Sequence, residues 1–166
     1  MECYQNRFPG SYIQSPAKNV PVYWGHYSIV EAELLCLTDL MESGRNWSYA
    51  IDMAGSEVMI ATNKELVDEI SDNMGRIFTR SMPIPEKLEY RFKYQHHYED
   101  DYCKDKTYCK YKSSKWKMLG KHEPPPFNLN IYKGAKSWRL PRKFVSFLLN
   151  HPVAKIFLGE VYYVWS

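Results

Sequence analysis

The sequence predicts an α/β domain whose strands pair in parallel. Segments of strand length and helix length alternate along residues 20–75, and this order is typical of α/β layers. Two Ser/Thr-x-x-Glu sequences each precede an apolar run with helical spacing, and such capping boxes mark helix N-termini. Hydrophobic residues make up 45% of the 166 residues, which suffices for a buried core.

The first helix is predicted to begin at Ser28 and to end before Gly44. Ser28 and Glu31 form its capping box, and glycine favours helix termination. Its apolar stripe consists of Val30, Leu34, Leu37 and Met41. Before it, residues 1–19 read as loop with a short strand near Tyr12 and Ile13. Residues 20–24 read as a short strand or an extended segment, which Pro21 places at a sheet edge or a strand start.

A second strand, a tight turn and a second helix come next. The strand is expected over Trp47–Met53 and the turn over Ala54–Glu57. Thr62 and Glu65 form the second capping box, and Gly75 ends the helix. The buried face of this helix is expected to consist of Leu66, Val67, Ile70 and Met74.

The rest of the chain has weaker patterns. The expected elements are, in order, a turn between Pro83 and Pro85, a strand or irregular segment at 90–98, a charged loop at 99–114, a rigid proline stop at 124–126, a strand at 128–132, a helix from Pro141 to Asn150 and a short helix at 153–158. The buried face of the helix after Pro141 is expected to consist of Phe144, Val145, Leu148 and Leu149.

Charge argues against a nucleic-acid-binding protein, because the net charge is only +3 and no known binding motif is present. Lysines cluster between Lys104 and Lys117 with aspartates beside them, which indicates a solvated loop; an anionic partner is the alternative. We find no signal peptide and no transmembrane segment in this sequence.

Four cysteines are too few for a disulfide scaffold in a chain of this size. Cys103 and Cys109 could close a small ring in an oxidising compartment. A zinc site with His96 and His97 is the alternative, although five residues separate the two cysteines and zinc sites usually have two to four.

The turn at Gly55, Ser56 and Glu57 is the first place where the sequence suggests a ligand. It follows a strand, and α/β sheets bind ligands at the carboxyl ends of their strands. Gly55 would permit close backbone approach, and Glu57 would face the ligand. An ordinary strand–helix loop is the alternative. Asp52, inside the strand, should be either paired or on a solvent face.

Well-known catalytic motifs are absent from the sequence. There is no phosphate loop, no dinucleotide-binding glycine motif, no serine-hydrolase elbow and no His-Glu-x-x-His zinc motif. Asp100 and Asp101 lie in the charged loop and are not expected to bind a metal. The glycosylation sequon at Asn46-Trp47-Ser48 is expected to be unused.

Several stretches, in order, resemble the core-2/I-branching β-1,6-N-acetylglucosaminyltransferases. VPVYWGHYSIVEAELLCLTDL (20–40) resembles the family's helix entry, and WSYAIDMAGSE (47–57) resembles its W-x-Y-x-I-x-x-x-G-x-D strand and turn, with Glu57 at the acidic position. Shorter matches are found at residues 61–65, 124–129, 132–134 and 142–145. The resemblance covers residues 3–158 and implies membership of this family.

By resemblance, the chain is a single partial glycosyltransferase domain over 1–166 with a GT-A-like fold. The implied reaction is an inverting transfer of N-acetylglucosamine from UDP-N-acetylglucosamine to an O-glycan or related acceptor, with no metal cofactor. The implied location of the full-length parent is the lumenal side of the Golgi membrane, held by an N-terminal anchor that is missing here.

An inverting transfer needs a carboxylate base and cations for the departing diphosphate. The family base lies in a Pro-Asp-Glu segment after the last helix, whereas this chain ends Gly159-Glu160-Val161 and onward without it, so no catalytic residue is assigned. The N-terminal nucleotide-binding strands and the diphosphate cations are also expected to be missing. We therefore expect this chain to be inactive and poorly soluble alone.

The resemblance makes Gly55, Ser56, Glu57, Glu86 and Glu89 the candidate substrate-binding residues. Glu86 and Glu89 stand where the family commonly has Lys and Arg. Two further departures are Phe78 at an acidic position and Gly134-Ala135-Lys136-Ser137 in place of Gly-Ser-Ala-Tyr. These differences leave the acceptor open.

The same resemblance bears on the cysteines and on an alternative function. Cys3 and Cys36 match family cysteines whose disulfide partners lie upstream, and Cys103 and Cys109 belong to a charged insertion at 99–117. The alternative is a non-catalytic relative that binds glycan or a partner protein. Continuation of the parent transcript into a Pro-Asp-Glu segment would separate the two.

Overall fold

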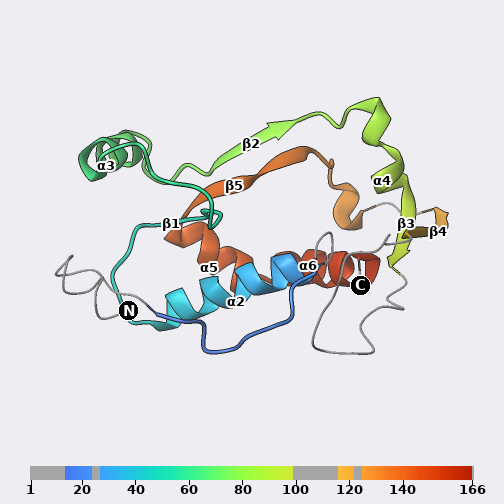
Figure 1. The fold of residues 1–166 in the computed structure, drawn as a ribbon, viewed down its shortest axis with the longest axis horizontal. Helices are drawn as coiled ribbons and strands as arrows, with labels where there is room; N and C mark the ends of the chain where they lie inside the picture. The colour runs from blue at the N-terminus through green and yellow to red at the C-terminus, as the bar shows by residue number, and fades with distance from the viewer. Residues whose placement is uncertain (1–13, 24–26, 99–115, 122–124, 166) are drawn as a thin grey trace. The chain divides into compact units, whose positions relative to one another are not determined.

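The computed structural model describes residues 14–23, 27–98, 116–121 and 125–165 (Figure 1). The chain divides into two compact units, Met1–Arg45 and Asn46–Ser166, and each is described by itself. The predicted strand near Tyr12 and the predicted charged loop at 99–114 lie outside the described residues.

The first unit contains helix α2, Ser28–Glu42, which confirms the predicted helix. It begins at Ser28 as predicted, but the predicted capping box is absent, because Tyr27 is the N-cap and no side chain caps the helix. The Ser28 hydroxyl instead accepts a hydrogen bond from the Tyr23 N–H at 3.0 Å, so it is not available to cap the helix. Gly44 follows the helix with φ of +67°, the left-handed conformation that glycine adopts easily.

Of the two alternatives predicted for residues 20–24, a short strand or an extended segment, the strand is not found in the described part. Residues 20–23 form no strand. Pro21 has no N–H to donate, and the N–H of Tyr23 bonds to the Ser28 side chain rather than to a neighbouring strand.

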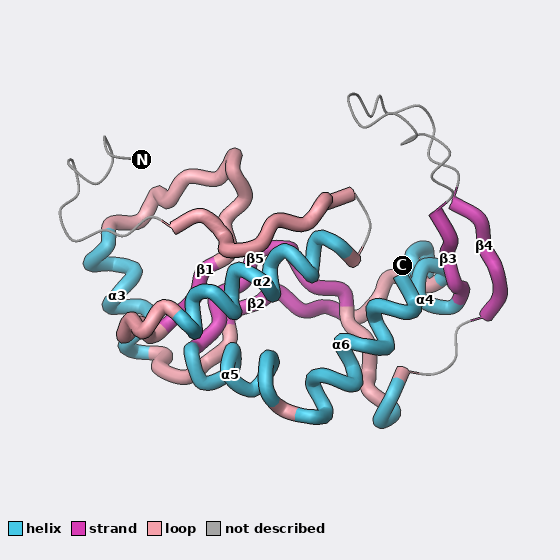
Figure 2. The backbone as a smooth tube through the Cα atoms, turned by 90° about the horizontal axis from the view of Figure 1, so that it is seen from below, coloured by secondary structure: helices cyan, strands magenta, loops and turns pink. Residues whose placement is uncertain are grey.

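The second unit contains a three-stranded sheet in the order β1-β5-β2, formed by β1 (Tyr49–Ile51), β5 (Lys133–Pro141) and β2 (Phe78–Met82) (Figure 2). Both pairings with β5 are antiparallel, so the predicted parallel pairing is wrong. The outer strands do run in the same direction, as a strand–helix–strand unit predicts. However, β5 comes from the far end of the sequence and lies between them, and every hydrogen-bonded pair is therefore antiparallel.

The strand predicted at 128–132 begins later, at Lys133. A 3-10 helix, η2, occupies Pro126–Asn128, and Phe127 and Asn128 have positive φ values of 61° and 53°. Strands need extended backbone, so these left-handed residues exclude a strand beginning at Asn128. Residues 129–132 have no regular structure.

Residues 86–98, which the sequence left open between strand and irregular structure after residue 90, form three short elements. They are the 3-10 helix η1 (Glu86–Leu88), the single helical turn α4 (Tyr90–Lys93) and strand β3 (Tyr94–Tyr98). β3 pairs antiparallel with β4, Trp116–Lys121. The predicted insertion at 99–117 therefore ends inside a strand.

Three longer helices complete the second unit. Helix α3, Asn63–Asp72, begins at the predicted capping box, with both of its hydrogen bonds between Thr62 and Glu65 present. Helix α5, Arg142–Asn150, begins after Pro141 as predicted. Helix α6, Pro152–Trp165, is longer than the predicted short helix. None of the described helices combines the length and the apolar character that a membrane crossing requires.

Among the described residues of the second unit, few side chains are deeply buried. They are Ala50 on β1, Leu140 and Pro141 on β5, Val145 on α5 and Ala154 on α6, and Val145 has no exposed surface. Helix α5 contacts both β5 and α6. The packing of α5 on β5 and the pairing of β1 with β5 hold these two strands in place beside the surface described next.

Candidate functional site

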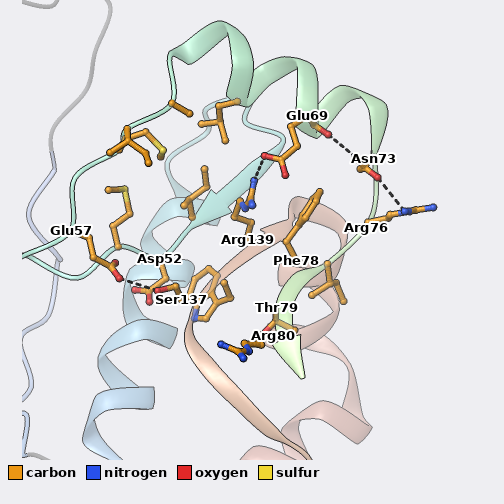
Figure 3. A pocket seen from close by; sticks show the side chains of 18 of the residues that line it. Asp52, Glu57, Glu69, Asn73, Arg76, Phe78, Thr79, Arg80, Ser137 and Arg139 are labelled. Atoms are coloured by element: carbon orange, nitrogen blue, oxygen red, sulfur yellow. Dashed lines mark hydrogen bonds and ion pairs between the residues drawn. The ribbon is translucent and has the colours of Figure 1, made fainter. Parts of the chain in front are cut away.

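A pocket of about 850 Å³ opens in the second unit at the end of β1 (Figure 3). Its walls come from the end of β1, the segment 57–61, one face of α3, the start of β2 and the middle of β5. Four segments within residues 51–80 therefore meet residues 137–139 of β5, which are distant in sequence. The polar side chains that line it are Asp52, Glu57, Glu69, Asn73, Arg76, Thr79, Arg80, Ser137 and Arg139.

Glu57 is held in this pocket by two hydrogen bonds to its carboxylate. The Ala54 N–H donates to Oε2 at 2.6 Å, and the Ser137 hydroxyl donates to Oε1 at 3.2 Å. The tight turn predicted at Ala54–Glu57 is present, since the Glu57 N–H donates to the Ala54 carbonyl at 2.9 Å. The local turn and the distant strand β5 together orient the carboxylate.

Only one of the predicted substrate-binding residues lines the pocket. That residue is Glu57; Gly55 and Ser56 lie in the turn beside it but are not part of the wall. A Cβ added to Gly55 would meet no atom within 4 Å, so no close backbone approach requires glycine there. Glu86 lies in η1 and Glu89 caps α4, where it forms an ion pair with Lys93.

Asp52 is a pocket residue that sequence reasoning noticed but did not assign. Its N–H donates to the Trp138 carbonyl at 3.0 Å, which extends the β1–β5 pairing by one residue. Its Oδ2 atom is buried and has no hydrogen-bond partner. The expectation that this carboxylate is either paired or on a solvent face is therefore wrong for Oδ2.

Arg139 forms the opposite wall with Glu69 and Phe78. Its Nη1 lies 2.6 Å from Glu69 Oε2 on α3, and its guanidinium carbon lies 4.6 Å from the centroid of the Phe78 ring. Phe78 and Arg139 are directly opposite each other in the β2–β5 register, which places the cation on the ring. The contact between Phe78 and Arg139 was not predicted from the sequence, because the two residues are far apart along the chain.

Two arginines from the β2 side of the pocket differ in their contacts. Arg76 Nη1 donates to Asn73 Oδ1 at 3.1 Å, while the Arg76 and Asn73 carbonyls both accept from the Tyr49 hydroxyl. Arg80 lies at the register irregularity between Thr79 and Ser81 and is exposed. A bulge of this kind redirects side chains, and here it adds a cation to the wall.

Metal and disulfide chemistry would depend on the His, Cys, Asp and Glu side chains. Within the described ranges, no group of three or more His, Cys, Asp or Glu side chains is arranged to hold a metal ion. Cys36 is a free, exposed thiol. Cys3, Cys103 and Cys109 lie outside the described residues, so their pairing and the alternative zinc site stay predictions.

Comparison with known proteins gives a consistent result. A family model described as Core-2/I-Branching enzyme matches residues 10–158. A Danio rerio protein named beta-1,3-galactosyl-O-glycosyl-glycoprotein beta-1,6-N-acetylglucosaminyltransferase 4 is 32% identical over 158 residues, which cover 94% of this chain and 34% of that protein. A Mus musculus N-acetyllactosaminide beta-1,6-N-acetylglucosaminyl-transferase is 33% identical over 147 residues, covering 89% and 34%. The chain therefore spans about a third of the length of these curated relatives.

Proposed function

Because this chain belongs to the Core-2/I-Branching enzyme family, we propose that it is part of a β-1,6-N-acetylglucosaminyltransferase. The parent protein transfers N-acetylglucosamine from UDP-N-acetylglucosamine to a hydroxyl of a glycan acceptor, with inversion. The observation that carries this proposal is Glu57. It stands at the acidic position of the family-like turn, and hydrogen bonds from Ala54 and Ser137 hold it in the wall of a pocket.

The part of the reaction assigned to this chain is glycan binding. The pocket combines carboxylates, which accept hydrogen bonds from sugar hydroxyls, with the apolar surface of Phe78 and Trp138, against which a sugar ring can pack. The catalytic base and the diphosphate-binding cations belong to other parts of the longer parent. Support for this division comes from the relatives, of whose length the chain spans about a third.

Three further features complete the proposal. The parent has a GT-A-like fold, of which the second unit supplies one sheet and the helices beside it. Transfer needs no metal ion, because the cations that stabilise the leaving diphosphate are basic side chains. The parent works on the lumenal side of the Golgi membrane.

The test is calorimetric titration of UDP-N-acetylglucosamine into the purified chain and into the longer parent, each with and without manganese. The expected result is metal-independent binding and transfer by the parent, and no binding by the 166-residue chain. Transfer that requires manganese would refute the metal-independent mechanism. Donor binding by the short chain would show that it contains more of the nucleotide site than proposed.

The second candidate function is glycan binding without transfer. The specific observation in its favour is that the pocket with Glu57 lies within this chain. A parent that binds glycans and yields no product with UDP-N-acetylglucosamine would establish this alternative.

A further inference from the structure

We propose that Asn46 is an N-glycosylation site, at which the side-chain amide carries an N-linked oligosaccharide. Asn46-Trp47-Ser48 is the only Asn-x-Ser/Thr sequence in the chain, and such a sequon is typical of a surface loop in a secreted or lumenal protein. The inference rests on the lumenal location proposed for the parent. It goes beyond the transferase function, because here the chain is the substrate of another enzyme.

The sequon precedes strand β1 and does not lie inside it. The strand predicted to begin at Trp47 starts only at Tyr49, and Asn46 and Trp47 have no regular secondary structure. Ser48 lies in a bend, where its backbone carbonyl accepts a hydrogen bond of 2.9 Å from the Arg142 N–H. This bond involves the backbone of Ser48 and not its hydroxyl. Asn46 therefore lies in irregular chain before the pairing with β5.

Exposure alternates along the three residues as glycosylation requires. Asn46 and Ser48 are exposed, whereas Trp47 is half-buried. The guanidinium carbon of Arg142 lies 5.3 Å from the centroid of the Trp47 ring, so a cation–π contact holds the bulky middle side chain against the protein. The two groups that a glycosylating enzyme recognises, the amide and the hydroxyl, are both at the surface. The structure therefore argues against the expectation that this sequon is unused.

The sequon and the pocket lie at opposite ends of β1. Asn46 precedes Tyr49, where the strand begins, and the pocket opens at Ile51 and Asp52, where the strand ends. Extended chain advances about 3.3 Å per residue, which places Asn46 up to about 20 Å from Asp52. An oligosaccharide at Asn46 would therefore add solubilising surface bulk without belonging to the pocket wall.

The covalent step joins Asn46 Nδ2 to the sugar of a polyprenyl-diphosphate-linked oligosaccharide. Nδ2 attacks C1 of the sugar that is linked to the diphosphate, so that an N–C1 bond forms and the C1–O bond to the diphosphate breaks. The lipid diphosphate leaves with the electron pair of the broken bond. Nδ2 gives up one of its two protons to a base of the lumenal oligosaccharyltransferase, and nothing is oxidised or reduced.

The experiment translates the full 166-residue chain with an appended signal peptide in the presence of microsomes, and compares its electrophoretic mobility before and after digestion with peptide N-glycosidase. This assay requires neither solubility nor folding of the chain. One glycosidase-sensitive shift is expected, which Asn46→Gln and Ser48→Ala should abolish and Ser48→Thr should retain. Asn130→Gln is the matched control and should keep the shift, because Asn130 is an exposed asparagine outside the sequon.

The longer parent, expressed in secretory cells, shows whether the site is used in its own setting. It should migrate one glycan step more slowly than its Asn46→Gln variant. No shift of the unchanged chain in microsomes, a shift that survives Asn46→Gln, or equal mobility of the parent and its variant overturns the proposal. Transfer from UDP-N-acetylglucosamine, measured on the same parent samples, reports separately on the transferase assignment. A parent without transfer activity that keeps the mobility difference would refute the proposed function and support the glycosylation site.

Discussion

The Ser137 hydroxyl donates a hydrogen bond of 3.2 Å to Glu57 Oε1 and so joins the middle of β5 to the turn after β1. Both residues are exposed, and the bond therefore contributes little to global stability. Its effect is to aim a carboxylate into the pocket, with the Ala54 N–H fixing the second oxygen. This hydrogen bond therefore connects the two parts of the sequence that line the pocket, residues 51–80 and residues 137–139.

Glu57→Gln is predicted to separate binding from stability. Glutamine keeps the size and one carbonyl oxygen but loses the charge, so glycan affinity of the chain should fall about tenfold or more while the free energy of unfolding changes by less than about 1 kcal/mol. Glycan titration and urea unfolding measure the two quantities. Glu86→Gln is the control, because Glu86 is outside the pocket wall. An equal loss of glycan affinity in both variants would mean that Glu86 also binds the glycan, as the sequence predicted, and that the pocket is not the whole binding site.

The ion pair between Arg139 and Glu69 is predicted to contribute little to the free energy of unfolding. Its larger effect is on the shape of the pocket. Their side chains are 30% and 49% exposed, so solvent screens the pair, and a double-mutant cycle with Arg139→Met and Glu69→Gln should give a coupling energy of about 0.5 kcal/mol. Arg139→Lys should keep the charge but weaken the stacking on Phe78. A coupling above about 2 kcal/mol would mean that the pair is far less screened than its exposure indicates.

Thr62→Ala is predicted to destabilise α3 by about 1 kcal/mol, since it removes the N-cap acceptor for the Glu65 N–H. Far-UV circular dichroism during urea unfolding measures this change. Asp72→Ala, at the other end of the same helix, is the control and should have a smaller effect. An unchanged midpoint for Thr62→Ala would show that the capping box does not contribute to stability.

The same capping box predicts a pH dependence. Hydrogen bonds from the Thr62 backbone and side chain lower the pKa of Glu65 from its ordinary value of 4.5. A depressed folded-state pKa gives a contribution that is fully present above the unfolded-state value and is lost as the pH falls through the folded-state value. The stability difference between the unchanged chain and Glu65→Gln should therefore shrink as the pH falls from 4.5 and vanish once the pH is below the lowered folded-state pKa. A difference that persisted there would refute this origin.

Val145→Ala is predicted to be the most damaging conservative change in the second unit. Val145 has no exposed surface, and removing two buried methyl groups with partial collapse of the site should cost about 2 kcal/mol. Val58→Ala is the same chemical change at a side chain that is 82% exposed, and it should be nearly neutral. Thermal unfolding of both variants provides the comparison.

Local features of the fold could be predicted from the sequence, and long-range pairing could not. The Thr62 capping box, the turn at Ala54–Glu57 and the helix after Pro141 depend on residues within one or two turns of each other. The order β1-β5-β2 depends on which distant strand is inserted between two others. No periodicity encodes that choice, and alternation of strands and helices suggested the commoner parallel arrangement.

The candidate site shows the same division between local and distant information. Glu57 was found because it follows a strand, and Asp52 was noticed because a carboxylate is unusual inside one. Ser137 and Phe78 appeared only as departures from a family pattern. Arg139 and Glu69 gave no signal, since neither residue is unusual in its own segment. Their contact exists only once β5 has paired with β2 and α3 lies beside them.

The central position of β5 also has a consequence for synthesis. β1 leaves the ribosome long before Pro141, the residue opposite its first position in β5. β2 likewise leaves it before Lys133 and Arg139, which lie opposite its two ends. Neither outer strand can complete its backbone hydrogen bonds in that interval, and contacts so distant in sequence form slowly. Nascent chains are therefore exposed to aggregation and to chaperones until β5 has emerged. Codon choice between β2 and β5, which sets the length of this delay, should affect the folded yield without any change of residue.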